Sequence, residues 1–352
     1  MISSLRLQYF RSYRDASFEF GDGVNIIVGP NASGKTNLLE AILVTCKGGS
    51  FRAKDTELMA MGAPWARLDG SDNTSQRTVK LLCQESGLVK KEFVIHDQKL
   101  SRLSMQKTIP VVLFEPNHLL LLHGSPDQRR EYLDNLLEQT TPGYAMLRRN
   151  YRRALAQRNA LLKRGDVAKN QLFAWNIKLS QLGSQVVVAR QNLITELNQQ
   201  IDDIYHAIVP NEPARVSLRY QATCDIEQYA SSLLQTLERR QDTDIERGFT
   251  SVGPHREDMI VEFDGRQASD VASRGEVRTI LLVLKIIELQ LIERARDTKP
   301  ILLLDDVFSE LDGARRKALT EAIQGYQTFI TTTDADVVVH HFMDSCTIIP
   351  LA

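Results

Sequence analysis

The spacing of apolar and polar residues divides the chain into three stretches. Residues 1–122 contain short runs in which apolar and polar positions alternate, a pattern typical of strands with one buried face. Residues 123–245 carry apolar residues every three or four positions, which predicts long helices. In residues 246–352, continuous apolar runs alternate with helical segments. We therefore predict an α/β domain formed by both ends of the chain, with a helical arm inserted between them.

The same pattern places the individual elements. The run at 299–306 is apolar up to its two final acids, which suits a parallel strand covered on both faces. Predicted strands lie at 5–10, 16–20, 24–28, 66–70, 77–84, 88–95, 111–114, 215–220, 259–263, 299–306, 328–333 and 346–350. Predicted helices lie at 37–43, 56–61, 126–140, 142–164, 170–208, 225–240, 276–294 and 314–325.

A glycine-rich segment connects a predicted strand to a predicted helix near the N-terminus. Its sequence, GPNASGKT at 29–36, fits the phosphate-binding loop pattern GxxxxGK[ST]. Gly29 and Gly34 permit backbone angles closed to other residues, so consecutive amides can surround an anion. Lys35 is expected to reach the β- and γ-phosphates, and Thr36 to place its hydroxyl on Mg²⁺. A chance glycine turn is the alternative, which the flanking strand and helix disfavour. The expected nucleotide contacts are Gly29, Pro30, Asn31, Ala32, Ser33, Gly34, Lys35, Thr36 and Asn37.

Two neighbouring acids, Asp305 and Asp306, end the apolar run at 299–306. In open α/β sheets, ligands bind beyond the carboxyl ends of the strands. Asp305 can therefore hold Mg²⁺ through water beside Thr36. Asp306 should face another direction, because side chains alternate along a strand, and it could polarise the attacking water. The alternative is a pair of acids that only terminates a strand.

Composition narrows the classes of protein that this chain can represent. It has 352 residues, of which 43% are hydrophobic and 25% charged, with a net charge of −1. These values are ordinary for a soluble globular protein. We expect no membrane span, since no apolar run approaches about 20 residues, and no signal peptide, since the N-terminal MISSLR lacks that architecture. The four cysteines form no CxxC pair, so we expect the cytoplasm and neither a disulfide scaffold nor a zinc site.

A nearly neutral chain can bind nucleic acid only through a local patch, and the arm contains one candidate. No acid occurs between residues 147 and 164. Arg148 and Arg152 are one helical turn apart, as are Arg149 and Arg153. Such rows can follow a DNA backbone without reading its sequence, but they can equally form a solvated helix face. The cluster consists of Arg148, Arg149, Arg152, Arg153, Arg158, Lys163 and Arg164.

Beyond these separate signals, a series of motifs resembles the RecF family, DNA-repair members of the SMC-like ABC ATPases. The SRGE segment at 273–276 looks like an ABC signature motif, and SELD at 309–312 looks like a D-loop. The motifs follow the family's order along nearly the whole chain. They are FRSY (10–13), GPNASGKTNLLEA (29–41), SFR (50–52), VVLFEPNHLLLLHGSPDQRREYLD (111–134), SVGPHRED (251–258), SRGEVR (273–278) and LLLDDVFSELD (302–312).

The resemblance implies an ABC-type P-loop ATPase head with a mixed sheet and flanking helices, in which two subunits enclose two ATP molecules with Mg²⁺. Ser273, Arg274 and Gly275 of one subunit would face the γ-phosphate held by Lys35 of the other. The family's pattern adds Arg11 and Asp312 to the nucleotide contacts, assigns catalysis to Lys35, Asp305 and Asp306, and assigns the metal to Thr36 and Asp305.

The resemblance also implies a function in recombinational repair and replication restart. ATP would close a homodimer on double- or single-stranded DNA without sequence specificity, and slow hydrolysis would release it. The family helps to load the recombinase on single-stranded DNA at gaps, with RecO and RecR as partners. The competing class is the ATP-binding subunit of a transporter. That class usually carries an LSGGQ signature and a switch histidine, which this sequence lacks.

Several positions depart from the family's pattern. Ala272 and Glu276 stand where the family commonly has Leu and Gln, and Asp306 stands where most ABC ATPases have Glu. A carboxylate at 276 would repel a γ-phosphate, so we expect its side chain to face away. The Q-loop residue is expected at Glu115 or Asn117, where the strand at 111–114 ends. His340 and His341 come after the switch position and are expected to be surface residues.

Overall fold

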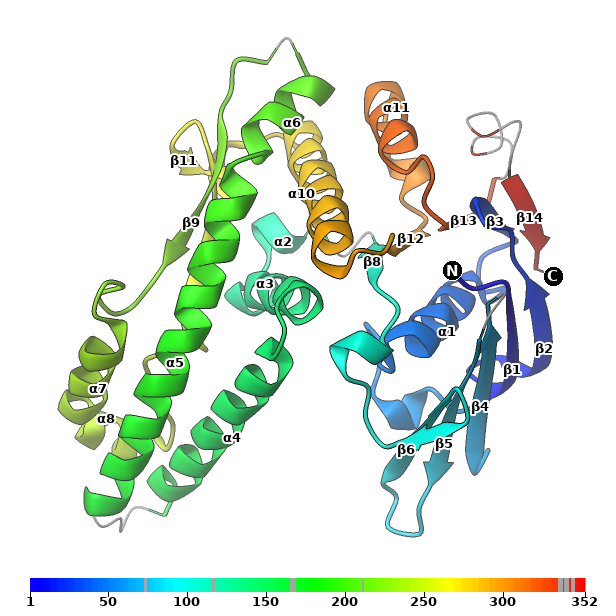
Figure 1. Ribbon diagram of the computed structural model, residues 1–352. Helices are drawn as coiled ribbons and strands as arrows, with labels where there is room; N and C mark the ends of the chain where they lie inside the picture. Colours follow the sequence, from blue (N-terminus) through cyan, green and yellow to red (C-terminus); the bar gives the residue numbers. More distant parts are fainter. Residues whose placement is uncertain are drawn as a thin grey trace. The chain divides into compact units, whose positions relative to one another are not determined.

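The computed structural model describes residues 1–352 except 73–74, 116–117, 119, 165–168, 211, 335–337, 339–341, 343–345 and 352. The chain forms two compact units (Figure 1). The first unit combines Met1–His118 with Glu288–Ala352, and the second is Leu119–Ile287. The second unit therefore extends further than the helical arm predicted at 123–245. No described helix is both long and apolar enough to cross a membrane.

A five-stranded parallel sheet occupies the first unit, with strand order β14-β3-β13-β12-β8. Its central strands β3, β12 and β13 are buried along nearly their whole length, as expected of parallel strands covered on both faces. Strand β13 lies between β3, which precedes the phosphate loop, and β12, which ends in Asp305. The strands are β3 (Val24–Val28), β8 (Val111–Phe114), β12 (Ile301–Asp305), β13 (Thr328–Thr332) and β14 (Cys346–Pro350).

An antiparallel sheet of six strands, ordered β2-β1-β4-β5-β6-β7, forms the other layer of this unit. Alternate residues such as Leu5, Leu7 and Leu68 point into the core, and the opposite face is polar. The strands are β1 (Ser4–Phe10), β2 (Tyr13–Glu19), β4 (Trp65–Ser71), β5 (Gln76–Cys83), β6 (Val89–Ile95) and β7 (Gln98–Leu100).

Helix α1 (Lys35–Lys47) joins the two sheets into one core. It contacts β8, β12 and β13 of the parallel sheet and β1, β4 and β5 of the antiparallel sheet. Nine consecutive residues, Leu38–Cys46, are buried, because the helix is covered on opposite sides. Any group at the N-terminus of α1 is therefore held by a rigid layer. The remaining helix wholly within this unit is α11 (Gly313–Ala322), among the described residues.

The second unit is mostly helical. Helix α5 packs on α3, α4 and α7 and also on strand β9. The helices are α2 (Leu120–His123), α3 (Pro126–Thr140), α4 (Tyr144–Leu162), α5 (Lys169–Asn198), α6 (Ile201–Ile208), α7 (Tyr229–Arg239), α8 (Gln241–Arg247), α9 (Ala268–Val271) and α10 (Arg274–Arg296), whose last residues are counted with the first unit.

Three sequence predictions are wrong in detail. The strand predicted at 259–263 was assigned to the ATPase head, but β10 (Asp258–Phe263) pairs with β9 (Val216–Gln221) and β11 (Arg266–Gln267) in the second unit. The helix predicted at 170–208 is two helices, α5 and α6, because the chain turns after Asn198. The helix predicted at 56–61 is a single 3₁₀ turn, Asp55–Glu57. In the first two cases, the spacing of apolar residues correctly indicated buried positions. It could not show which strands pair with the segment at 259–263 or where the long helix ends.

Candidate functional site

Residues 29–34 form the loop between β3 and α1, and Lys35 and Thr36 begin α1, the arrangement that a phosphate-binding loop requires. Gly34 has φ of 101°, a left-handed conformation that favours glycine. A Cβ atom on Gly29 would lie 2.6 Å from both the Ser33 Oγ atom and the Leu351 carbonyl oxygen. Neither glycine can be replaced without moving the loop. Ala32 also has positive φ, 68°, and so marks backbone strain in the same loop.

Two polar side chains of this segment, Lys35 and Ser33, show how it could hold an anion. The Lys35 ammonium donates hydrogen bonds to the carbonyl oxygens of Gly29 at 2.7 Å and Pro30 at 2.8 Å. An ammonium has three protons, so one donor remains for an anion. The Ser33 hydroxyl is buried and has no hydrogen-bond partner among the described residues. A spare ammonium proton and an unpaired hydroxyl fit a phosphate group in this loop.

Thr36 and Asp305 meet at the N-terminus of α1, although 269 positions separate them in the sequence. The Thr36 hydroxyl lies 3.0 Å from each carboxylate oxygen of Asp305. Thr331 on β13 donates to Asp305 Oδ1 at 2.7 Å and accepts from the Asp306 N–H at 2.9 Å. Hydroxyl and carboxylate oxygens are donors that Mg²⁺ prefers, so Thr36 and Asp305 suit a magnesium ion. Sequence reasoning missed Thr331.

Asp306 lies just beyond the end of β12 and adopts φ of 52°. A left-handed conformation is uncommon for residues other than glycine, and aspartate and asparagine tolerate it best. The chain therefore leaves the strand between the two acids. A backbone turn, and not the strand alternation assumed from the sequence, therefore sets the direction of the Asp306 side chain.

A buried carboxylate on α1 explains two of the motifs near the loop. Glu40 is fully buried and accepts hydrogen bonds from Arg11 at 2.8 and 2.9 Å, from Arg52 at 3.1 Å and from Ser50 at 2.5 Å. Burial opposes its ionisation, but these hydrogen bonds outweigh burial and hold the pKa of Glu40 below its ordinary value. Arg11, predicted as a nucleotide contact, is thus engaged with the protein in this structure.

Asn37 extends this network along the first turn of α1. Its side-chain amide donates to Ser12 Oγ at 3.0 Å, and its oxygen accepts from Arg52 at 2.6 Å. Tyr13 donates to the Gly34 carbonyl oxygen at 3.1 Å. The FRSY and SFR motifs therefore brace the loop and α1 from the side of the antiparallel sheet.

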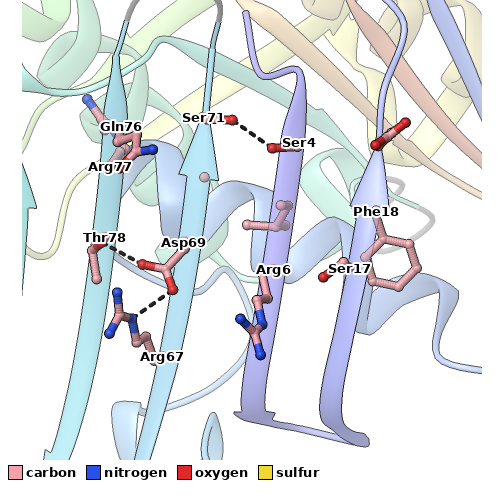
Figure 2. A pocket seen from close by; sticks show the side chains of 13 residues that line it. Ser4, Arg6, Ser17, Phe18, Arg67, Asp69, Ser71, Gln76, Arg77 and Thr78 are labelled. Carbon is pink, nitrogen blue, oxygen red and sulfur yellow. Dashed lines mark hydrogen bonds and ion pairs between the residues drawn. The ribbon is translucent and has the colours of Figure 1, made fainter.

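The polar face of the antiparallel sheet carries a separate hollow of about 390 Å³ (Figure 2). Small side chains, among them Ser4, Ser17 and Ser71, create it, and Ser4 and Ser71 contact each other at 2.6 Å. Within it, Asp69 accepts from Arg67 at 2.7 Å and from Thr78 at 2.6 Å. It contains none of the predicted site residues.

The predicted signature residues lie in the second unit, at the N-terminus of α10. Ser273 and Glu276 form a capping box: the Ser273 N–H donates to Glu276 Oε2 at 2.5 Å, and the Glu276 N–H donates to Ser273 Oγ at 3.3 Å. Ser273 and Arg274 are exposed, and Gly275 is half-buried. The Glu276 carboxylate thus folds back onto an amide that the helix would leave unpaired, and its expected orientation away from a γ-phosphate stays a prediction.

Asp312, the predicted D-loop residue, is the N-cap of α11 and accepts from the Arg315 N–H at 3.0 Å. This backbone hydrogen bond, together with the charge of Arg315, lowers the pKa of Asp312. Among the candidate Q-loop residues, Glu115 donates its N–H to His118 Nδ1, whereas Asn117 lies outside the described residues. His340 and His341 also lie outside them.

The basic cluster of the arm divides into buried and exposed arginines. Arg148 is buried and pairs with Glu131 at 2.5 Å, Glu138 at 2.8 Å and Asp134 at 2.9 Å. Arg158 is fully buried against Asp244 at 2.8 Å. Placing Arg148 on a DNA-binding surface was therefore wrong: the acids of α3 and α8 face this side of α4. The exposed members are Arg149, Arg152, Arg153, Lys163 and Arg164.

Further buried charges connect the motifs of the second unit. Arg129 donates to both carboxylate oxygens of Asp258 at 2.7 and 2.8 Å. Glu257 accepts from the hydroxyls of Tyr220 at 2.7 Å and Tyr229 at 2.6 Å. The acids of SVGPHRED and an arginine of SPDQRREYLD thus hold sheet and helices together.

His255 and Arg256, the basic residues of the same motif, contact side chains and backbone within the second unit. His255 Nε2 lies 3.1 Å from the Thr250 carbonyl oxygen and must donate to it, so Nδ1 accepts from the Tyr151 hydroxyl at 2.8 Å. Burial lowers the pKa of His255 to about 4, which keeps this tautomer neutral. Arg256 stacks on Phe249 within the same unit.

Comparison with known proteins agrees with these motifs. The family model for the RecF/RecN/SMC N-terminal domain matches residues 1–348. DNA replication and repair protein RecF of Heliobacterium modesticaldum is 34% identical over 343 residues, which cover 94% of this chain and 92% of the relative. The RecF proteins of Acidothermus cellulolyticus and Bacillus subtilis are 35% and 34% identical, covering 95% and 96% of this chain and 94% and 95% of those relatives.

Solved structures show the same fold. The structure of the recombination mediator protein RecF with ATP, from the RecFOR pathway, superposes with a TM-score of 0.85 at 28% identity and covers 95% of this chain and 92% of that one. An Smc head bound to the C-terminal winged-helix domain of ScpA has a TM-score of 0.53 at 16% identity, covering 97% and 91%, and shows the fold alone. The predicted ABC-type head with an inserted helical arm is confirmed. This chain belongs to the RecF family of DNA replication and repair proteins, which carry the ABC-type head of SMC-like ATPases.

Proposed function

We propose that this protein is an ATP-driven DNA-binding switch of recombinational repair. ATP closes a homodimer on DNA, and slow hydrolysis opens it. The observation that carries the proposal is the contact of the Thr36 hydroxyl with both oxygens of Asp305 at 3.0 Å, at the mouth of the loop after β3. This contact unites the two halves of a nucleotide and Mg²⁺ site from distant parts of the chain.

Each group of the loop has a distinct part in this proposal. The loop amides and the Lys35 ammonium bind the β- and γ-phosphates. Thr36 and Asp305 hold Mg²⁺, which, when bound, neutralises charge between those phosphates. Asp306 orients the attacking water and accepts its proton. Gly29 and Gly34 allow the backbone to approach the phosphates closely.

The site is completed by a second subunit. Ser273, Arg274 and Gly275 start helix α10, whose N-terminus offers a partial positive charge and a guanidinium for a γ-phosphate. Both Ser273 and Arg274 are exposed in the described chain, so a partner can reach them. Asp312 of the D-loop would contact the nucleotide at the same interface.

The DNA-binding surface proposed for the arm follows from charge segregation. Between Gln139 and Thr195 the sequence contains ten basic residues and one acid, Asp166, in a chain whose net charge is −1. Arg148, Arg158 and Arg190 of this set are buried, so the surface consists of exposed members only. Arg149, Arg152 and Arg153 are exposed on α4. Guanidinium groups on one helix can follow a phosphate backbone, which positions DNA without reading its sequence. Relatives named for the RecFOR pathway support recombinase loading with RecO and RecR as the cellular role.

Analytical sedimentation tests the proposal. The protein would be sedimented alone, with Mg²⁺ and ATP, and with both plus duplex DNA at low and high salt. We expect a monomer without ATP, a dimer with it, and binding to DNA that weakens as salt increases. A monomer under all conditions would contradict the switch, and ATP-driven dimers that do not bind DNA would contradict the DNA-binding part of the proposal.

A further inference from the structure

One residue contacts both acids at the end of β12. Strand β13 lies between the strands that carry the phosphate loop and Asp305, and Thr331 is in register with Asp305. The Thr331 hydroxyl lies 2.7 Å from Asp305 Oδ1 and 2.9 Å from the Asp306 backbone nitrogen. The side chain is fully buried, so bulk water does not compete for these hydrogen bonds.

The direction of each hydrogen bond follows from the groups involved. A backbone N–H can only donate, so the Asp306 N–H donates to Thr331, whose single hydroxyl proton has two acceptors within reach. The Leu304 carbonyl oxygen lies 3.4 Å away and Asp305 Oδ1 only 2.7 Å away, so the proton goes to the charged and nearer Asp305. Asp305 then receives one hydroxyl proton from Thr36 on α1 and another from Thr331 on β13. Two donors from different elements fix the plane of the carboxylate.

The bond to Asp306 has a separate effect. Asp306 adopts a left-handed conformation with φ of 52°, which is strained for most residues. The hydrogen bond from its N–H to Thr331 helps to hold this turn, which decides where the second acid leaves the strand.

We propose that Thr331 is a positioning residue that orients Asp305 toward Mg²⁺ and holds Asp306 in its turn. The hydroxyl acts through the two acids. Groups that orient a metal ligand in this way commonly change metal affinity or activity by roughly 10–100-fold when they are removed. The inference rests on the proposed function, since it assumes that Thr36 and Asp305 bind Mg²⁺ with ATP.

The test measures nucleotide affinity as a function of Mg²⁺ concentration for the wild type, Thr331→Val and Thr331→Ser. Valine matches threonine in shape but lacks the hydroxyl, and serine restores it. Thr328→Val is the matched control, because Thr328 is buried on the same strand and its hydroxyl donates to the Tyr326 carbonyl, away from both acids. Thr331→Ala replaces the valine variant if the added methyl prevents folding, which a thermal melt detects.

We expect Thr331→Val to need at least about tenfold more Mg²⁺ for the same gain in ATP affinity, with ATP affinity in EDTA unchanged. Thr331→Ser and Thr328→Val should titrate like the wild type. Equal Mg²⁺ titrations for Thr331→Val and the wild type would overturn the inference. It would also be overturned if Thr331→Val lost as much ATP affinity in EDTA as in Mg²⁺, because that result indicates general damage to the site. A wild type without any Mg²⁺ dependence would overturn the proposed metal site itself, so the two failures are distinguishable.

Discussion

Arg11 and Glu40 form a two-bond ion pair, 2.8 and 2.9 Å long, in which the Glu40 side chain is completely buried beside the phosphate loop helix. Arg52 shares the same carboxylate. An isolated buried carboxylate is costly, and two guanidinium groups without it would repel each other. Glu40 on α1 therefore holds two loops against this helix: the loop after β1, through Arg11, and the loop after α1, through Arg52.

Glu40→Gln should lower the free energy of unfolding by about 3 kcal/mol at pH 7, because it removes the charge that both arginines share while keeping the shape. The folded pKa of Glu40 lies below its ordinary value of 4.5, so its stabilising contribution is present above that value and is lost as the pH falls through the folded pKa. Urea unfolding from pH 7 down to pH 3 should show the difference shrink. Glu85→Gln, at an exposed position, is the control and should change stability little at any pH.

Lys35→Ala should weaken ATP binding and abolish ATP-driven dimerisation, because the phosphates lose a point charge and the loop carbonyls of Gly29 and Pro30 lose their donor. Fluorescence titration with a labelled nucleotide and sedimentation would measure both effects. A variant that dimerised with ATP at wild-type concentrations would contradict the assignment of this loop.

Asp306→Asn should trap an ATP-bound dimer, whereas Asp305→Asn should lose the Mg²⁺-dependent state. Asparagine tolerates the left-handed conformation of residue 306, so the substitution removes a proton acceptor without straining the backbone. At position 305 it removes the carboxylate that meets Thr36. Binding and turnover measured on both variants decide the matter, and an equal loss of ATP binding would show that the acids share one role.

Ser273→Arg should leave ATP binding by the monomer nearly intact and block dimerisation and turnover. The exposed start of α10 is proposed to meet the partner's γ-phosphate, and a bulky side chain there would prevent the subunits from closing. Mixing Ser273→Arg with Lys35→Ala provides a control, since one composite site keeps both wild-type halves. Recovery of dimers in the mixture is expected. Normal turnover by dilute Ser273→Arg monomers would contradict a shared site.

Replacing Arg149, Arg152 and Arg153 with glutamine should weaken DNA binding for every sequence and reduce the slope of log affinity against log salt by up to about 2.7. ATP binding should not change. The matched control removes three exposed charges from the first unit, at Lys90, Lys99 and Arg102. Equal losses of affinity in the two triple variants would indicate a nonspecific effect of net charge. Arg148→Ala should act on stability instead, since it leaves buried Asp134 with one fewer partner.

The sequence alone determined the elements whose signals are local. The strand at 24–28, the helix at 126–140 and the short strand at 111–114 were predicted with the bounds that the structure has. Apolar periodicity, capping residues and turn residues act within a few positions, so they can be recognised without knowing the fold. The loop at 29–36 belongs to this class, because strand, glycines and helix are contiguous.

Tertiary structure decided which charges are available and which acids are positioned. Arg148 and Arg149 are neighbours with the same chemistry, yet one is buried among three acids and the other is exposed. Glu40 and Thr331 carried no signal of their own, because their partners come from other strands and loops. Periodicity shows which face of an element is buried, but the partner that meets that face depends on packing between distant segments.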